Sequence, residues 1–396
     1  MKKFFCPLGV GISWLVLAGC ATPPPSAPPR LSGDPVADGA EMIAHGPLKD
    51  RVLWEYRTAL AAMYRGDFAR ARQVLDDALL TLGGIYGKDK SARRARSFFS
   101  GEEKKRFIGE AYERVMAYYY RGILYWMDGE PDNARACFRT GEIEDGDAEK
   151  SEYSADYVLL DYLDGLASTK LGGDGSDALK RAQAESKFGA PVAYNHKGNV
   201  LFFVEFGRGP SKYATGRYRE ELRFAPGNMP VRSASIRIGN QLVVLMPYDD
   251  LYFQATTRGG RVMDHILANK AVFKTTTDEV GTGAILGGAI LGSQQGHHDS
   301  RDEIGAGLLA FGLLSKILSG AAVPAADTRN WDNLPQYLSF TALSLPPGTH
   351  VATVEFKDAQ GHVLPSYTKT MTINVPSEAR DKVVFVSDHS VTPQTL

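Results

Sequence analysis

The hydrophobic pattern of the chain changes at about Pro191, and this change limits the possible folds more than any other feature. Residues 50–190 repeat apolar side chains at the spacing of an α-helix and are rich in Ala, Leu, Tyr and Arg. The residues that follow form short apolar runs separated by Gly, Pro, Asn and Asp, which is the pattern of strands and turns. Helices followed by strands predict an α+β fold, with a helical domain over residues 49–190 and a β-rich domain over residues 191–396.

Three similar turns divide the helical domain. Each places a glycine beside an acidic residue and is followed by small residues at helical spacing: Gly66-Asp67 before Ala71 and Ala78, Gly129-Glu130 before Ala134, and Gly173-Asp174 before Ala178 and Ala182. The glycine closes one helix, and the small residues let the next helix approach it closely. This pattern resembles the tetratricopeptide repeat (TPR) and predicts a TPR-like array of helical hairpins. The turns are spaced more widely than the roughly 34-residue period of that repeat, so a generic helical bundle with Ala-rich contacts is the alternative.

The β-rich domain opens with a mainly apolar run at residues 199–206, which predicts a buried strand. The dipeptide Gly239-Asn240 between two apolar runs predicts a hairpin. Near the C-terminus, residues 350–356, 367–375 and 382–386 predict a three-stranded meander. Strands of this length joined by turns indicate a β-sandwich-like domain.

A glycine-rich stretch interrupts the β-rich domain at residues 279–323. Two apolar runs, residues 280–292 and 304–323, flank a polar loop and contain glycines at helical contact spacing, such as Gly283 and Gly287. Such glycines let two helices touch, so we predict a glycine-zipper helical hairpin. The first run is shorter than the roughly 20 residues that span a bilayer, and Lys316 interrupts the second. A hairpin that dips into the membrane and a self-association face are the alternatives.

The N-terminus has the parts of a secretory signal. Lys2 and Lys3 precede an apolar run that is too short to span a bilayer, and Leu17-Ala18-Gly19-Cys20 ends this run. These last four residues resemble the lipobox of bacterial lipoproteins, which implies cleavage before Cys20 and a lipid on its thiol. Residues 1–19 are therefore the expected signal peptide, and residues 20–48 are an expected lipidated, Pro-rich tether. By comparison with enterobacterial lipoproteins, Ala21 favours the outer membrane, with the body of the protein in the periplasm.

Charge and cysteine content exclude several kinds of partner and linkage. The chain has 45 Lys and Arg against 46 Asp and Glu, and the signal peptide removes two lysines. The mature protein therefore lacks the basic excess that binding to nucleic acid requires. Cys6 leaves with the signal and Cys20 takes the lipid, so no intramolecular disulfide is expected. We interpret the third cysteine, Cys137, as a small buried apolar residue on a helix.

No group of residues has the spacing of a catalytic or cofactor site. His297-His298-Asp299 lacks a third ligand on rigid structure for a metal ion. The pairs Glu220-Glu221 and Asp249-Asp250 would direct their side chains to opposite faces of a strand, and we interpret them as solvated charges. Ser211-Lys212 has no supporting element for a hydrolase dyad, and no helix follows Gly207-Arg208-Gly209 to make a phosphate loop. We therefore expect no enzyme activity, cofactor or metal.

The most distinctive cluster is Asp327-Thr328-Arg329-Asn330-Trp331, followed by Asn333-Leu334-Pro335. We predict that Asp327 and Arg329 form a charge-assisted bond and a stacked contact beside Trp331, which would fix the entry into the β-rich domain. With the lipobox and residues 207–212, this cluster makes most of residues 17–375 resemble a family of uncharacterised bacterial lipoproteins. The resemblance implies a TPR-like first half. It also implies a role in the cell envelope, because members are often encoded near lipoproteins that activate peptidoglycan synthases.

These features favour a protein-binding role. We expect a scaffold or adaptor that is anchored in the outer membrane through lipid on Cys20 and binds another envelope protein through its helical surface. A link to peptidoglycan synthesis is implied by the family resemblance. One alternative is an enzyme that acts on cell-wall or surface polysaccharide, which would need two carboxylates in one pocket. Another is a subunit of an export or pore assembly that inserts through residues 280–323.

Lipidation at Cys20 can be tested directly. The variant Cys20→Ser lacks the thiol that would receive the lipid, so it should accumulate as uncleaved precursor and incorporate no labelled palmitate. The wild-type chain, labelled in parallel, should incorporate palmitate, since stable anchoring by lipid needs more than one acyl chain. Equal labelling of the two proteins would refute the assignment.

Overall fold

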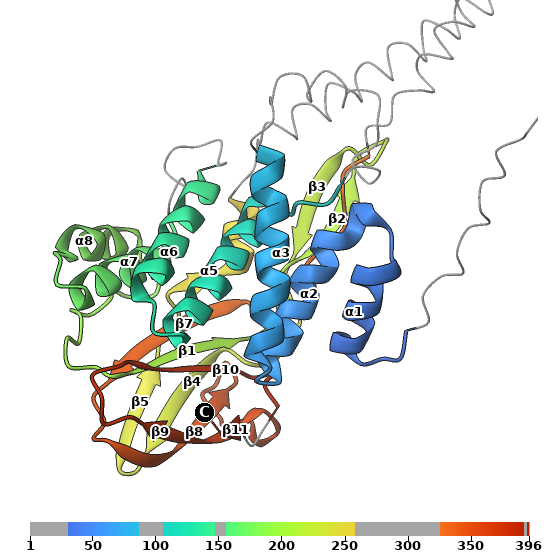
Figure 1. Ribbon diagram of the computed structural model, residues 1–396. Coiled ribbons are helices and arrows are strands. Elements are labelled where there is room, and N and C mark those ends of the chain that lie inside the picture. The colour runs from blue at the N-terminus through green and yellow to red at the C-terminus, as the bar shows by residue number, and fades with distance from the viewer. Residues whose placement is uncertain (1–30, 87–105, 147–155, 258–324, 392–393, 396) are drawn as a thin grey trace, which may run out of the picture.

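The computed structural model describes residues 31–86, 106–146, 156–257, 325–391 and 394–395. Helices form the N-terminal half and sheets form most of the C-terminal half, so the fold is of the α+β type (Figure 1). The predicted signal peptide, residues 20–30 of the predicted tether and the glycine-rich residues 279–323 lie outside the described residues. In the part of the chain that is described, no helix combines the length and the apolar character needed to cross a membrane.

The helical half consists of a short first helix and three helical hairpins. They are α1 (Pro35–His45), the 3-10 turn η1 (Leu48–Asp50), α2 (Arg51–Tyr64) with α3 (Phe68–Tyr86), α5 (Ala111–Met127) with α6 (Pro131–Asp145), and α7 (Val158–Lys170) with α8 (Ser176–Glu185). A glycine with positive φ lies in the turn of each hairpin: Gly66 (76°), Gly129 (83°) and Gly172 (82°). Other residues rarely adopt this conformation. The predicted glycine turns are therefore present, the third one bending at Gly172 rather than at Gly173.

Small residues bring neighbouring helices together, both within and between the hairpins. A Cβ atom on Gly122 would lie only 2.4 Å from Cε1 of Phe138, and one on Gly141 would lie 2.6 Å from Cδ2 of Leu160. Ala134, which the sequence placed at such a contact, is fully buried. The helices consequently pack against one another in the order in which they follow along the chain.

The two helices of each hairpin differ in exposure. The first helices, α2, α5 and α7, are buried along most of their length. They also make the contacts to the sheets, because α2 and α5 pack on β10 (Lys382–Ser387) and α7 packs on β7 (Tyr337–Leu343). The second helices α6 and α8 bury only a narrow stripe of residues each. The exposed surface of the helical array is therefore made mainly by its second helices.

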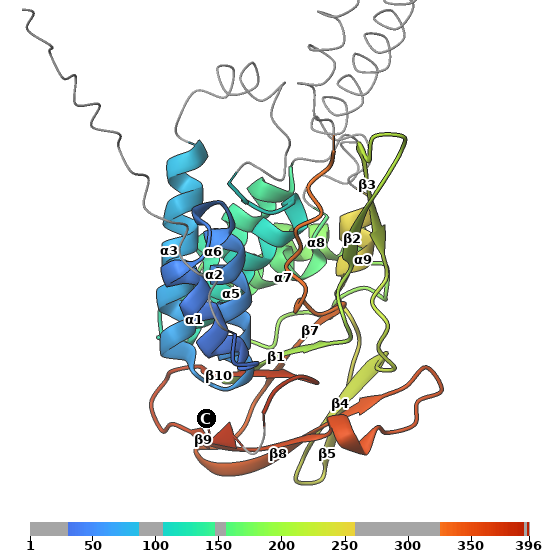
Figure 2. The same cartoon turned by 90° about the vertical axis from the view of Figure 1, so that its right-hand side faces the viewer.

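Two sheets lie below the helices in the view of Figure 2. The four-stranded sheet has the order β10-β1-β7-β6, and the five-stranded sheet has the order β11-β9-β8-β4-β5. A separate hairpin, β2 with β3, stands beside the helices. The remaining bounds are β1 (Val200–Phe206), β2 (Ser211–Thr215), β3 (Glu221–Ala225), β4 (Ser233–Ile238), β5 (Gln241–Leu245), β6 (Asp249–Asp250), α9 (Leu251–Thr256), β8 (Gly348–Lys357), η4 (Pro365–Tyr367), β9 (Lys369–Val375) and β11 (Gln394–Thr395).

The four-stranded sheet is the central layer of the molecule. Leu201 and Phe203 of β1 belong to a core that the helices share, whereas Phe202 and Val204 point into a second core shared with the five-stranded sheet. A strand covered on both faces needs an apolar residue at nearly every position. This requirement explains the mainly apolar run at residues 199–206, and the burial of every residue of β1 confirms the predicted buried strand. It also means that the regions 49–190 and 191–396 share one of their cores.

The C-terminal strands depart from the predicted meander. The hairpin at Gly239-Asn240 is confirmed as β4 and β5, and β8 pairs with β9 as expected. However, β10 does not continue beside β9, because it pairs in parallel with β1 in the other sheet. The burial patterns explain the difference: β10 is buried at almost every position, whereas β9 alternates between buried and exposed positions. A strand that is apolar on both faces is stable only in the central layer.

The helical part of the chain also starts earlier than predicted. Residues 35–45, assigned from the sequence to the tether, form α1. Asp34 caps this helix by accepting hydrogen bonds from the N–H groups of Val36 and Ala37, and Pro35 occupies the first helical position. The Pro-rich composition of this region suggested a tether throughout. The Asp34-Pro35 pair, however, is typical of a helix start.

Candidate functional site

The two distinctive stretches of the sequence meet where the helices join the sheets. Residues 325–335 run in an extended path between the helices and the β2-β3 hairpin (Figure 2). Residues 207–212 lie beside them, because Gly209 N–H donates to Leu334 O at 2.8 Å and Asn330 Nδ2 donates to Pro210 O at 3.1 Å. The two stretches are therefore parts of a single junction.

Arg329 ties this junction to the start of the helical half. Its guanidinium donates to both carboxylate oxygens of Asp327, at 2.6 to 3.0 Å, and to Oδ1 of Asp50 at 2.7 Å. The charge-assisted bond predicted from the sequence is thus present. Asp327 and Asp50 are both carboxylates, so the arginine neutralises an acidic pair at the point where α2 begins, and its Nη1 also donates to Lys49 O at 3.2 Å.

The stacked contact differs from the prediction. Arg329 lies over the ring of Phe107, 5.4 Å from its centroid, and not over Trp331. Trp331 is fully buried and stacks on Tyr56, with the ring centroids 4.4 Å apart and the planes 21° from parallel. The indole therefore fills the shared core, which leaves the arginine at the edge of the junction where water reaches it.

A buried ion pair lies directly behind this segment. The ammonium of Lys212 bonds to Oε2 of Glu113, and the two side chains are 2% and 0% exposed. Lys212 Nζ also donates to Arg329 O at 3.0 Å, and Glu113 Oε1 accepts the N–H of Trp331 at 2.8 Å. The same carboxylate accepts the N–H of Glu110 at 2.7 Å in the capping box that starts α5. One carboxylate thus joins a helix, a strand and the junction segment.

Burial and pairing act in opposite directions on these two groups. Removal from water raises the pKa of Glu113 and lowers the pKa of Lys212, while the charge of each partner has the reverse effect on the other. A buried charge that loses its partner is strongly destabilising. The pair is therefore held in place by its hydrogen bonds and makes each half of the molecule depend on the other.

Side chains of α2 hold the backbone of the junction segment. Arg57 Nη2 donates to Asn330 O at 2.7 Å, and the Tyr64 hydroxyl donates to Asn333 O at 3.0 Å. Asn333 Nδ2 donates in return to Arg57 O at 3.0 Å. Because these contacts use backbone carbonyls, they fix the extended path of the segment. The cluster around Asp327, Arg329 and Trp331 therefore fastens the sheets to the first helices.

A second buried acid, Glu205, lies between the helices and the central sheet. It is the charged residue of the apolar strand β1, and its Oε2 accepts a hydrogen bond from the Tyr120 hydroxyl at 2.8 Å. Burial raises the pKa of Glu205 to about 8, although hydrogen bonds from Tyr120 and Tyr64 lower it. The carboxyl group therefore carries a proton at neutral pH, which avoids the cost of a buried charge.

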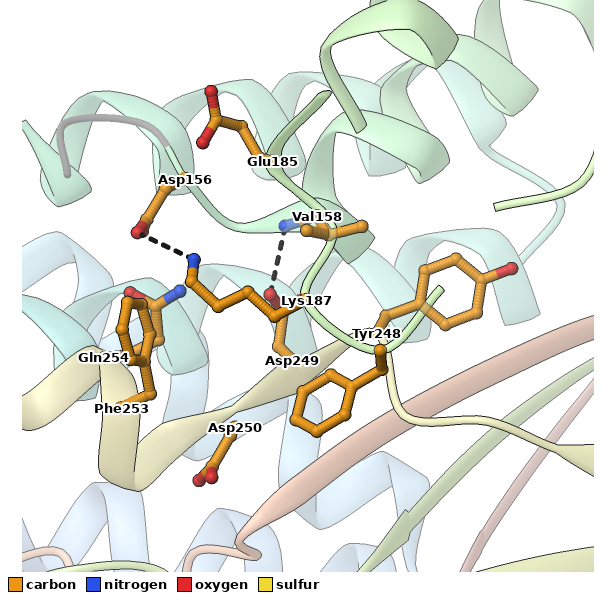
Figure 3. Close-up of a pocket in the computed structure, with 10 residues that line it drawn as sticks. Asp156, Val158, Glu185, Lys187, Tyr248, Asp249, Asp250, Phe253 and Gln254 are labelled. Carbon is orange, nitrogen blue, oxygen red and sulfur yellow. Dashed lines mark hydrogen bonds and ion pairs between the residues drawn. The ribbon is translucent and has the colours of Figure 1, made fainter. Parts of the chain in front are cut away.

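A pocket opens beside the start of α7 (Figure 3). It has a volume of about 140 Å³. Its polar lining comes from Asp156, Glu185, Lys187, Asp249, Asp250 and Gln254. The concentration of carboxyl groups makes this pocket the place where acid–base chemistry would be sought.

Two of these carboxylates cap helices. Asp249 accepts the N–H groups of Val158 and Leu159, at 3.0 and 2.9 Å, at the N-terminus of α7. Asp250 accepts the N–H of Tyr252 at 2.9 Å and caps α9. The interpretation of this pair as solvated charges is wrong for Asp249, which is buried, and burial raises its pKa to about 7. Asp249 lies in β6, and this strand places its carboxylate at the N-terminus of α7.

A third carboxylate of the pocket is paired with a lysine. Asp156 Oδ2 lies 3.7 Å from Lys187 Nζ, and the same ammonium lies 4.0 Å above the ring of Phe253. Figure 3 shows the Lys187 side chain crossing the pocket towards Asp156. Three carboxylates of the pocket thus serve caps and an ion pair. These contacts hold the segment before α7, the loop that carries Lys187 and α9 around the pocket, and Glu185 adds a fourth carboxyl group to its lining.

The other candidates from the sequence are placed as follows. Ser211 is exposed while the Lys212 side chain is buried, since neighbours on a strand face opposite ways, so they form no dyad. Glu221 is exposed and pairs with Arg223 at 2.7 Å, as expected of a solvated charge. Cys137 is only partly buried, and burial raises its pKa to about 11. The Gly207 N–H donates to Asp388 Oδ2 at 2.9 Å, so this backbone group binds a carboxylate of the protein itself.

Cys20 and His297-His298-Asp299 lie outside the described residues. Among the residues that the structure does describe, no three His, Cys, Asp or Glu side chains are grouped so as to hold a metal ion. Comparisons with models of known protein families, with curated proteins and with solved structures found no match to this chain.

The buried ion pair can be tested by removing one partner. Lys212→Met should lower the free energy of unfolding by about 3–5 kcal/mol, because it leaves the Glu113 carboxylate buried without its cation. The double variant with Glu113→Gln should recover part of this loss, since the amide oxygen still accepts the Trp331 N–H. Denaturant unfolding measures both values. The matched control Lys180→Met breaks an exposed pair with Asp177 and should cost at most about 1 kcal/mol. Strictly additive losses in the double variant would contradict the coupling.

The protonation of Glu205 predicts a pH dependence of stability. Its pKa is about 8 in the folded chain against an ordinary value of 4.5, so its stabilising effect is complete below about pH 4.5 and is lost as the pH rises to 8. Glu205→Gln removes this titration. Between these pH values, the free energy of unfolding of the variant should fall less steeply than that of the wild type, by up to about 1.4 kcal/mol per pH unit.

The measurement is denaturant unfolding at several pH values. Asp249 contributes a slope of the same sign in both proteins, so the comparison depends on the difference between them. The exposed Glu221→Gln controls for the loss of one carboxyl group and should keep the wild-type slope. Parallel curves for Glu205→Gln and the wild type would show that Glu205 is ionised in the folded chain.

Proposed function

We propose that this chain is a lipid-anchored scaffold of the bacterial cell envelope that binds another envelope protein through the second helices of its helical hairpins. The anchor is the lipid on Cys20, and the outer membrane and periplasm are the proposed location. In this proposal the helical half is a TPR-like array, and the two sheets make a β-sandwich-like support for it. The link to peptidoglycan synthesis comes from the family resemblance alone.

The observation that carries the proposal is the unequal exposure of the two helices in each hairpin. The first helices α2, α5 and α7 are buried, two of them against the sheet through β10 and one through β7. In arrays of helical hairpins, curvature creates the extended surfaces that bind partners. Here the chain covers the first helices with its own strands and the junction segment. The surface left for a partner is therefore formed by α3, α6 and α8.

Large apolar side chains on this surface support the proposal. Leu80 on α3 and Ile143 on α6 are 78% and 76% exposed. Around them α6 and α8 present mainly charged and polar residues. Apolar anchors within a polar surround are typical of interfaces between proteins that associate reversibly.

The pocket weighs against the polysaccharide enzyme that the sequence left open. Such an enzyme needs one carboxyl group as acid and a second as base or nucleophile. In the pocket Asp249 and Asp250 cap helices, and Asp156 pairs with Lys187. The alternative of a pore or export subunit depends on residues 280–323, which lie outside the described residues.

Site-specific photo-crosslinking in intact cells tests the proposal. A photoreactive amino acid at Leu80 or Ile143 of the lipidated protein should give a covalent adduct with another envelope protein, which mass spectrometry would identify. The same amino acid at Val351, an exposed residue of β8, is the matched control and should give no such adduct. Adducts at Val351 but not at Leu80 or Ile143 would place the partner on the sheets and overturn the proposed surface.

A further inference from the structure

The strand β5 forms one edge of the five-stranded sheet. In the described residues it pairs with β4 alone, whereas at the opposite edge the two-residue strand β11 pairs with β9. An edge strand offers a row of N–H and C=O groups that can pair with another strand. The chain therefore covers part of β9 with its last strand, whereas β5 has no such neighbour among the described residues.

The side chains of this edge are apolar and exposed. Leu242, Val244 and Met246 point to the outer face and are 51%, 63% and 56% exposed. Residues 239–248 contain no charged residue. Proteins usually protect an open edge with lysine, another charge, an interrupting proline or a bulge. Pro247 lies beyond the end of β5, so neither a charge nor a proline protects the edge from Gln241 to Met246.

The hairpin geometry shows which backbone groups face outward. Gly239 has a φ of 56° at the first turn position, which fits a two-residue hairpin of type II′. In such a hairpin the residues that flank the turn, Ile238 and Gln241, exchange hydrogen bonds, and the bonded pairs then alternate along the strands. Leu242 and Val244 consequently direct their N–H and C=O groups away from β4, to the open edge.

We propose that β5 pairs with β5 of a second copy of this chain, antiparallel and centred on Val244. In this register Val244 lies opposite Val244 of the partner subunit, and Leu242 lies opposite Met246 of the partner subunit. Both of these pairs are apolar, and the next pair, Gln241 with Pro247 of the partner subunit, is uncharged, so a two-fold pairing brings no like charges together. Val243 and Leu245 point to the core side, where they pack in or against the core between the sheets. The pairing would therefore extend that core across the two-fold axis.

Disulfide trapping in membranes tests this register with the full chain, in a Cys137→Ser background. Val244→Cys should form a dimer under mild oxidation, because bonded antiparallel pairs have Cα atoms about 5.5 Å apart, within the reach of a disulfide. Val351→Cys, exposed on the interior strand β8, is the matched control and should stay monomeric on a non-reducing gel.

A second experiment fixes the direction of the strands. Leu242→Cys alone should not cross-link, because two such residues would be about 13 Å apart at 3.3 Å per residue. Coexpression of Leu242→Cys with a tagged Met246→Cys chain should give a mixed dimer. Cross-linking of Leu242→Cys with itself, or no dimer from Val244→Cys, would overturn the proposal. An adduct of Val244→Cys with a different protein would overturn it as well, and would assign the edge to a strand of that protein.

Discussion

The Glu113–Lys212 ion pair is the interaction on which the union of the two halves depends. The carboxylate belongs to α5 and the ammonium to β2, and the junction segment completes their hydrogen bonds through its backbone at Arg329 and Trp331. Neither half could bury its charge alone without a large loss of stability. The shared core, in which Trp331 stacks on Tyr56, has the same effect for the apolar residues. Helices and sheets are therefore expected to form as one cooperative unit.

The central sheet determines which surface of the helical array remains exposed to other molecules. Because β1 and β10 are apolar on both faces, they must be covered on one side by helices and on the other by strands. Glu205 is tolerated in this layer through its raised pKa and the hydroxyl of Tyr120. Covering the sheet uses the first helix of every hairpin. The second helices are left as surface, and their apolar residues Leu80 and Ile143 follow from that division.

Local features were predictable from the sequence, and partner choice over long distances was not. The strand at residues 199–206, the hairpin at Gly239-Asn240 and the glycine turns follow from periodicity and turn chemistry, which act within a few residues. The apolar run of β10 looks the same whichever sheet it joins, so its pairing with β1 was missed. Lys212 was singled out, yet its partner Glu113 is 99 residues away. Two signals could have been used: a lone glutamate at position 205 within an apolar run, and the Asp-Pro pair at 34–35 that starts α1.

The order of the strands in the central sheet has a consequence for the continuity of the chain. β1 precedes residue 258, yet it lies between β7 and β10, which both follow residue 324. The two ends of the intervening stretch are held by the folded body, at α9 on one side and by the bond from Ala326 N–H to Arg219 O on the other. A cut between them would leave two pieces interlocked through alternating strands. Strand pairing of β1 with β7 and β10 would therefore hold the two pieces together independently of the covalent link between them.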